Sequence, residues 1–141
     1  MKGIAMIVLS AAALAAACAH KGGPEAAART REQAATDEAA LASALSGRIA
    51  GPAQDCVNQA DLGGHNSYGR GVIVFSGRTN DVVYVNRPPR GCPGLEFGRA
   101  LRTKTTTQLC RGDIVTVFDP VTGVEYGGCS LGEFTPYRRT P

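Results

Sequence analysis

Five cysteines are the residues of this 141-residue chain that carry the most definite chemistry. Cys18 closes an apolar run near the start, and the other four follow at Cys56, Cys92, Cys110 and Cys129. Thiolates that bind zinc usually stand about two to four residues apart. No two of these cysteines have that spacing, so we expect neither a metal nor a cofactor. Four cysteines in an exported domain instead predict two disulfides.

The four domain cysteines allow three pairings. A predicted hairpin with its turn at Pro120–Gly123 runs back to Cys110 on one side and on to Cys129 on the other. Both cysteines then lie at the same end of the hairpin, so we predict a Cys110–Cys129 bond. By elimination Cys56 pairs with Cys92, which would clamp the start of the domain to the loop after the first hairpin.

Catalytic chemistry has few candidates. Nucleophilic catalysis needs a serine or cysteine, a base and a group that orients the base. His65 is the single histidine after residue 48, in the glycine-rich stretch GGHNSYG, which predicts an exposed loop with Ser67 two residues away. Paired carboxylates can hydrolyse glycosides, but turn and cap hydrogen bonds are the expected role of the four near the second hairpin, Asp113, Asp119, Glu125 and Glu133. We therefore predict no catalytic residue.

An arginine-bearing loop follows the first hairpin, in NRPPRGCPGLEFGRAL. Arg87, Arg90 and Arg99 flank two prolines that hold the chain extended and a Pro-Gly pair that favours a tight turn. Arginines gathered in one loop can bind an anion or a carboxylate. The interpretation we favour is a disulfide-pinned connection with solvated arginines. The tripeptide Arg111–Asp113 resembles an integrin-binding motif and is predicted to be a turn before a strand.

The overall charge excludes one class of partner. The chain has 15 Lys and Arg against 12 Asp and Glu, a net charge of +3, and the basic residues are scattered. Nucleic-acid-binding domains carry clustered basic residues. We therefore expect no nucleic-acid partner.

Two hairpins are predicted from β-branched and aromatic residues. One joins Gly71–Gly77 to Asp81–Asn86, and the other joins Asp113–Asp119 to the stretch VEYGGC. The threonine-rich, polar segment Arg102–Gln108 predicts an edge strand.

Both faces of the first predicted strand are apolar. Val72 and Val74 point one way, and Ile73 and Phe75 point the other. A strand buried on both faces belongs in a barrel or a sandwich. We therefore predict a mainly β domain over residues 48–141, a small disulfide-stapled barrel or sandwich of about five to seven short strands.

Residues 18–47 predict a tether in front of this domain. Pro24 suits the first turn of a helix, the alanine-rich residues after it favour helix, and Gly47 is a natural stop. The large apolar side chains are confined to Leu41 and Leu45. We expect a partly helical, solvated spacer whose last turns touch the domain.

Residues 1–17 have the layout of a signal peptide. Lys2 is followed by an apolar run of about fourteen residues that ends in small side chains. That run is shorter than the roughly twenty residues a membrane-spanning helix needs. The stretch LAAAC, ending at Cys18, resembles the lipobox of bacterial lipoproteins, with the leucine one position earlier than usual. In that motif the cysteine becomes the lipidated first residue.

Lipidation of Cys18 accounts for the one cysteine without a partner. By analogy with bacterial lipoproteins, the non-acidic Ala19 implies an outer-membrane lipoprotein that faces the periplasm. Two other cuts stay open. One leaves Cys18 as a free first residue, and the other starts the mature chain at His20. Either would make the protein soluble in the periplasm or secreted.

Three motifs, NRPPRGCPGLEF, QLCRGDIVTVFD and GGCSLGEF, together resemble a family of small exported bacterial proteins of unknown function. The shared pattern is a cysteine followed by CPGLxF, LCxGDI and CxLGxF, and it spans Cys56 to Phe134. The resemblance implies export and four structural cysteines, and it implies no activity.

These features predict a non-catalytic domain of the cell envelope. We expect the lipid anchor to hold it at the membrane and an envelope protein or glycan to be its partner. The alternative is a small periplasmic enzyme or enzyme inhibitor, in which His65 or two carboxylates would meet in a pocket.

Overall fold

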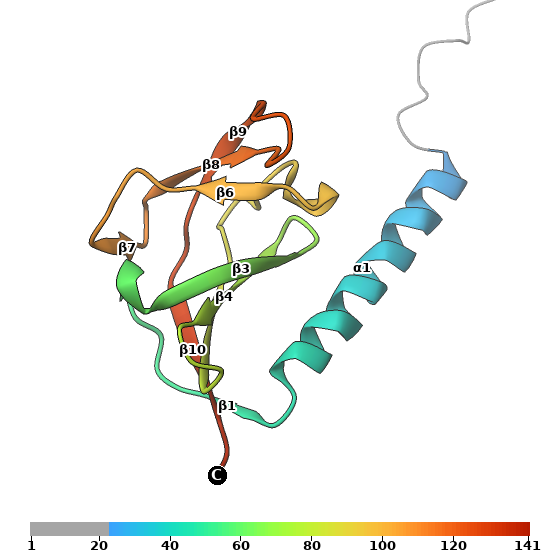
Figure 1. Cartoon of the computed structure of the whole chain (residues 1–141). Helices are drawn as coiled ribbons and strands as arrows, with labels where there is room; N and C mark the ends of the chain where they lie inside the picture. The colour runs from blue at the N-terminus through green and yellow to red at the C-terminus, as the bar shows by residue number, and fades with distance from the viewer. Residues whose placement is uncertain (1–22) are drawn as a thin grey trace, which may run out of the picture.

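The computed structural model describes residues 23–141, and Figure 1 shows their arrangement. The predicted signal peptide 1–17 and the predicted lipidation site Cys18 lie outside the described residues. One helix is followed by ten short strands and two 3-10 turns. In chain order these are α1 (Pro24–Leu45), β1 (Arg48–Ala50), β2 (Cys56–Asn58), η1 (Gln59–Asp61), β3 (Leu62–Tyr68), β4 (Val72–Gly77), β5 (Val82–Asn86), η2 (Leu95–Phe97), β6 (Ala100–Arg102), β7 (Gln108–Cys110), β8 (Ile114–Phe118), β9 (Glu125–Ser130) and β10 (Phe134–Arg139).

The strands pair antiparallel and form three open sheets. The largest has the order β1-β10-β5-β4-β3, β2 pairs with β7, and β6-β8-β9 form the third. The prediction of a mainly β fold is confirmed. The barrel alternative is wrong, because no sheet within residues 23–141 closes on itself. Ten strands replace the smaller number expected, because four of them have three residues each and show no alternation that a sequence pattern could reveal.

Both predicted hairpins are present. In the first, β4 pairs with β5 and Phe75 lies opposite Tyr84. In the second, β8 pairs with β9. The predicted edge strand Arg102–Gln108 is wrong, since its first residue ends β6, its last begins β7, and residues 103–107 are irregular. The chain must turn there because β6 pairs with β8 whereas β7 pairs with β2 in a different sheet.

The main core lies between the five-stranded sheet and the two smaller sheets. Ile73 and Phe75 of β4 enter it from the large sheet, and Val115 and Val117 of β8 enter it from the three-stranded sheet. Phe134, Leu95, Leu109 and Leu131 complete its large buried side chains. The prediction that β4 is apolar on both faces is confirmed, because Val72 and Val74 belong to a second cluster on the other side of the sheet.

That second cluster is where the helix packs. Leu41 of α1 is 3% exposed and lies against Val72, Val74 and Val85, with Leu45 packed beside it. Most other side chains of α1 are exposed. The helix therefore contacts the domain through its C-terminal part and runs alongside the sheet (Figure 1).

The disulfides join Cys56 to Cys110 and Cys92 to Cys129, with Cα–Cα distances of 4.0 and 5.0 Å. Both predicted pairs, Cys56–Cys92 and Cys110–Cys129, are therefore wrong. The reason is that the hairpin does not continue straight back to Cys110. In the β8–β9 register Cys129 lies opposite Val115. Cys110 belongs to a different sheet, where it lies opposite Cys56 in the β2–β7 pair.

Removing the Cys92–Cys129 bond tests both the cysteine pairing and the contribution of this bond to the unfolding free energy. The bond closes a separation of 37 residues, and on the chain-entropy account the double variant Cys92→Ala, Cys129→Ala should lose about 4 kcal/mol of unfolding free energy, measured by denaturant titration. Non-reducing tryptic maps provide the control, because Arg and Lys residues place each domain cysteine on its own peptide. A linked pair holding Cys56 and Cys92 would contradict the assignment.

Candidate functional site

A cleft of about 480 Å³ opens between β3 and the segment that joins β6 to β7. Its polar lining comes from Gln59, His65, Thr103 and Thr106. Its apolar lining comes from Leu62, Phe75, Leu101 and Leu109. A concave site with an apolar lining and a few converging polar groups is the usual form of a binding pocket.

The threonine-rich segment forms one wall of the cleft because hydrogen bonds to η1 hold it. The side-chain amide of Gln59 donates to the Thr103 hydroxyl, and the Gln59 backbone N–H donates to the Thr107 carbonyl at 2.9 Å. The Thr105 hydroxyl is buried and has no hydrogen-bond partner among residues 23–141. The wall is thus irregular backbone that Gln59 ties to η1 at both Thr103 and Thr107.

The opposite wall is a free sheet edge. β3 is the last strand of the five-stranded sheet, and within residues 23–141 its backbone pairs with β4 alone. It has seven residues, whereas β1 at the other edge has three. Gly63, Gly64 and His65 of β3 border the cleft, and a register irregularity between Leu62 and Gly64 opens the ladder there. An edge of this length offers unpaired backbone groups to another strand.

His65 lies on β3, so the prediction of an exposed loop is wrong. The side chain is half-buried beside Phe75, with ring centroids 6.1 Å apart, and burial lowers the pKa of His65 below its usual value. Ser67 is engaged elsewhere, because its hydroxyl donates to the Leu95 carbonyl at 3.1 Å. No nucleophile is therefore paired with this imidazole among the described residues.

The four carboxylates of the second hairpin each have a structural partner. Asp113 accepts from the Cys110 N–H at 2.8 Å. Asp119 accepts from two N–H groups of its own turn, and these donors hold the pKa of Asp119 below its usual value. Glu125 pairs with Arg102, and Glu133 pairs with an arginine described below. The expected turn role is confirmed for the two aspartates and is wrong for the two glutamates, which form ion pairs.

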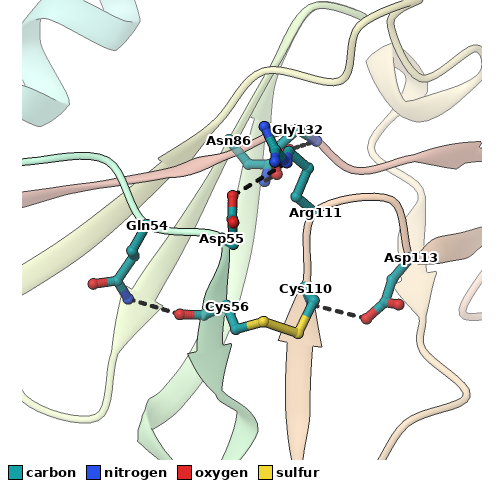
Figure 2. Close-up of a disulfide and its surroundings, with 8 residues drawn as sticks. All are labelled: Gln54, Asp55, Cys56, Asn86, Cys110, Arg111, Asp113 and Gly132. Carbon is teal, nitrogen blue, oxygen red and sulfur yellow. Dashed lines mark hydrogen bonds and ion pairs between the residues drawn. A yellow bond between two sulfur atoms is a disulfide. The ribbon is translucent and has the colours of Figure 1, made fainter.

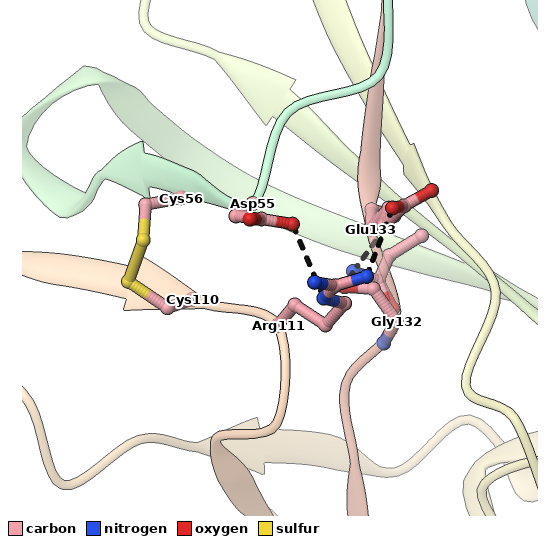
Figure 3. A network of polar contacts seen from close by, with 7 residues as sticks. Asp55, Cys56, Cys110, Arg111, Gly132 and Glu133 are labelled. Atoms are coloured by element: carbon pink, nitrogen blue, oxygen red, sulfur yellow. Dashed lines mark hydrogen bonds and ion pairs between the residues drawn. A yellow bond between two sulfur atoms is a disulfide. The ribbon is translucent and has the colours of Figure 1, made fainter.

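Arg111 joins two distant parts of the chain beside the Cys56–Cys110 bond. Its guanidinium lies 3.1 Å from the Asp55 carboxylate and 3.0 Å from the Glu133 carboxylate (Figure 3). Gly112 and Asp113 complete a turn between β7 and β8, held by hydrogen bonds from Gly112 to Leu131 and from Leu131 to Asp113. The prediction that this tripeptide is a turn before a strand is confirmed.

Buried Asn86 fixes the segment that presents Glu133. Its side-chain amide donates to the Gly132 carbonyl at 2.7 Å and accepts from the Gly132 N–H at 2.9 Å. Figure 2 draws this pair in the same region as Arg111, and the Asn86 amide also donates to the carbonyl of Glu133, the ion-pair partner of Arg111. The polar groups in this region hold one another, so they support the fold and do not point to a ligand.

The predicted arginine loop does not act as one group. Arg99 stacks on Tyr126, 3.4 Å from the ring centroid, and lies 5.0 Å from the ring centroid of Phe97. It also donates to the Gly94 carbonyl at 3.2 Å. Arg87 and Arg90 are exposed, and their side chains form no ion pair within residues 23–141. Arg90 borders a separate cleft of about 360 Å³.

The sequence pattern does not predict the β3 cleft. It predicts a strand for the threonines that line the cleft and an exposed loop for His65. The available signal was the density of threonines in TKTTTQ, which is typical of an irregular, hydrogen-bonded segment as well as of a strand. In the part of the chain that the structure describes, no group of three or more His, Cys, Asp or Glu could hold a metal ion.

Comparison with protein-family models, curated proteins and solved structures found no match for this chain. The resemblance to a family of exported proteins therefore stays a prediction. The α1 helix is not apolar enough to cross a membrane, and no other helix between residues 23 and 141 could do so.

Burial of His65 predicts a pH dependence of stability. Its pKa is lowered in the folded protein from 6.5, so the unfolded chain binds more protons as the pH falls below about 6.5. The unfolding free energy of the protein therefore decreases as the pH falls from the unfolded pKa of His65 toward its lower folded pKa. The variant His65→Gln should lose less unfolding free energy than wild type between about pH 7.5 and about pH 5. Equal losses in denaturant titrations would contradict burial of the imidazole.

Proposed function

We propose that this chain is a non-catalytic, lipid-anchored domain of the cell envelope that binds an extended segment of another envelope protein along the free edge of β3. What carries the proposal is the position of this edge beside an uncharged cleft. The lipid on Cys18, the outer-membrane location and the partner are parts of one proposal, and the anchor and the partner are tested separately.

Export is supported by the disulfides. Both bonds are of the kind that form and persist in an oxidising compartment outside the cytoplasm. With four cysteines paired, Cys18 is the single one that remains. A diacylglyceryl group and an amide-linked acyl chain on Cys18 would anchor the protein stably, because firm anchoring takes about two chains.

Binding of a protein strand is supported by the chemistry of the edge and the cleft. Strand addition uses the backbone of an exposed edge for affinity and adjacent pockets for side-chain specificity. The backbone of β3 from residue 63 to residue 68 makes no hydrogen bond outside its ladder with β4 in the described residues. The cleft beside it presents hydroxyl, amide and neutral imidazole groups around an apolar floor. An uncharged side chain of the added strand fits such a lining.

The non-catalytic part of the proposal is supported by the placement of reactive groups. His65 and Ser67 share a strand, but the serine hydroxyl is bonded to Leu95. The carboxylates near the second hairpin are separately engaged in two turns and two ion pairs. An enzyme would need at least two of these groups to converge on one substrate.

The intact mass of the detergent-extracted mature protein tests the anchor. We expect a chain that starts at Cys18 and carries the acyl groups, and that gains four protons when its two disulfides are reduced. A mass that begins at His20 without lipid would contradict the anchor and leave a soluble periplasmic or secreted domain.

Site-specific crosslinking in intact cells tests the partner. A benzophenone amino acid at Thr106, exposed on the cleft, should give a discrete adduct with one protein. The matched control places it at Ala50, exposed on β1 at the other edge of the same sheet, where no adduct should form. Equal products at both positions, or an adduct removed by glycan hydrolases, would overturn a protein strand on β3.

A further inference from the structure

A second surface is unlike the cleft because it consists of exposed apolar side chains. Val121 is 90% exposed, Phe97 71%, Val124 51% and Tyr126 45%. Val121, Val124 and Tyr126 belong to the turn and the second strand of the β8–β9 hairpin, and Phe97 ends η2 beside it. We call these four residues the hairpin tip.

Arg99 makes the hairpin tip continuous. Its guanidinium contacts the Tyr126 ring on β9 and lies near the Phe97 ring on η2, so the two elements form one surface. A second arginine, Arg102, lies over the Phe118 ring at 4.4 Å and pairs with Glu125 at 2.6 Å. The Phe118 ring is half-buried and the Arg102 charge is paired, so Arg99, stacked on exposed rings, is the arginine that places a cationic group beside the apolar surface. Exposed apolar patches of this kind mark contact with proteins or membranes.

The direction of α1 indicates whether the hairpin tip contacts a protein or a membrane. The helix docks through Leu41 and Leu45, and nearer its middle Asp37 lies against the β3–β4 turn at Gly69. It therefore runs back along the domain, and its Pro24 end and the β8–β9 hairpin lie at the same end of the molecule (Figure 1). β1 and the chain's C-terminus lie at the opposite end.

The proposed anchor on Cys18 would place that end next to the membrane. Cys18 precedes Pro24 by six residues, which span at most about 20 Å when fully extended. A lipid on Cys18 thus restricts the start of α1, and the hairpin tip that shares its end of the molecule, to the neighbourhood of the bilayer. The helix then acts as an orienting element, since much of its length lies beside the domain.

We propose that the hairpin tip rests in the headgroup region of the membrane that holds the lipid anchor. This inference relies on the proposed acylation of Cys18. Val121 and Phe97 would enter the acyl boundary, Tyr126 would sit at the interface where aromatic rings are enriched, and Arg99 would reach lipid phosphates while stacked on the rings. The protein would then have a fixed orientation, with β1 and the C-terminus directed away from the bilayer.

Single tryptophans test the contact. The chain has no Trp, so Val121→Trp and Ile49→Trp each report from one position. Ile49 is the matched control, because it is 63% exposed and lies on β1 at the far end of the molecule (Figure 1). The acylated variants are reconstituted in vesicles of phosphatidylethanolamine and phosphatidylglycerol, with and without brominated acyl chains.

We expect a blue shift and loss of emission in brominated lipid for Val121→Trp, and neither change for Ile49→Trp. Equal emission changes at both positions, or none at either, would overturn the inference. A spectrum of Val121→Trp that shifts only on adding envelope protein would assign the tip to a protein partner and also overturn it. The intact mass of the same sample shows independently whether Cys18 is acylated. Failure of the proposed anchor can therefore be distinguished from failure of the hairpin tip to contact the membrane.

Discussion

The two smaller sheets depend on packing against the five-stranded sheet for their stability, and each contains a disulfide: one closes the β2–β7 pair, and the other joins β9 to the loop after β5. A two-stranded pair is marginal in water without further support. The Cys56–Cys110 bond lies within the β2–β7 pair, at residues directly opposite each other. The Cys92–Cys129 bond joins the loop after β5 to β9 of the three-stranded sheet. Because the cleft wall runs between these two small sheets, the candidate site exists only while both are held in place.

The free-energy contributions of the disulfides and the ion pairs differ, and this difference separates interactions that stabilise the fold from interactions that position its segments. Each disulfide closes a long loop and contributes about 4 kcal/mol on the chain-entropy account, whereas an exposed ion pair contributes less than about 1 kcal/mol. The pairs of Arg111 with Asp55 and Glu133 are more than half exposed. Their role is to set where the segments before β2 and β10 meet. The buried amide of Asn86 does more, since leaving it unpaired would bury polar atoms without partners.

The elements with a strong local pattern were predictable, and those fixed by long-range pairing were not. The helix from Pro24 and the two hairpins follow from propensity, turn residues and apolar periodicity. The three-residue strands are defined by partners far along the chain, so no local signal reveals them. The prediction of the disulfide pairing was wrong for the same reason. It depended on whether Cys110 lies in line with β8, and the chain turns between Cys110 and the start of β8. The cleft is made from threonines whose irregular path is set by Gln59.

The connectivity of the cysteines has a consequence for biogenesis. Numbered along the domain, the first cysteine bonds to the third and the second to the fourth. A chain that enters an oxidising compartment from its N-terminus exposes Cys56 and then Cys92, and these two are not native partners. Oxidation in order of arrival would therefore trap a wrong bond, and thiolate attack on that bond is the route back. A chain oxidised in that order would need disulfide isomerisation as well as an oxidant to reach its native pairing.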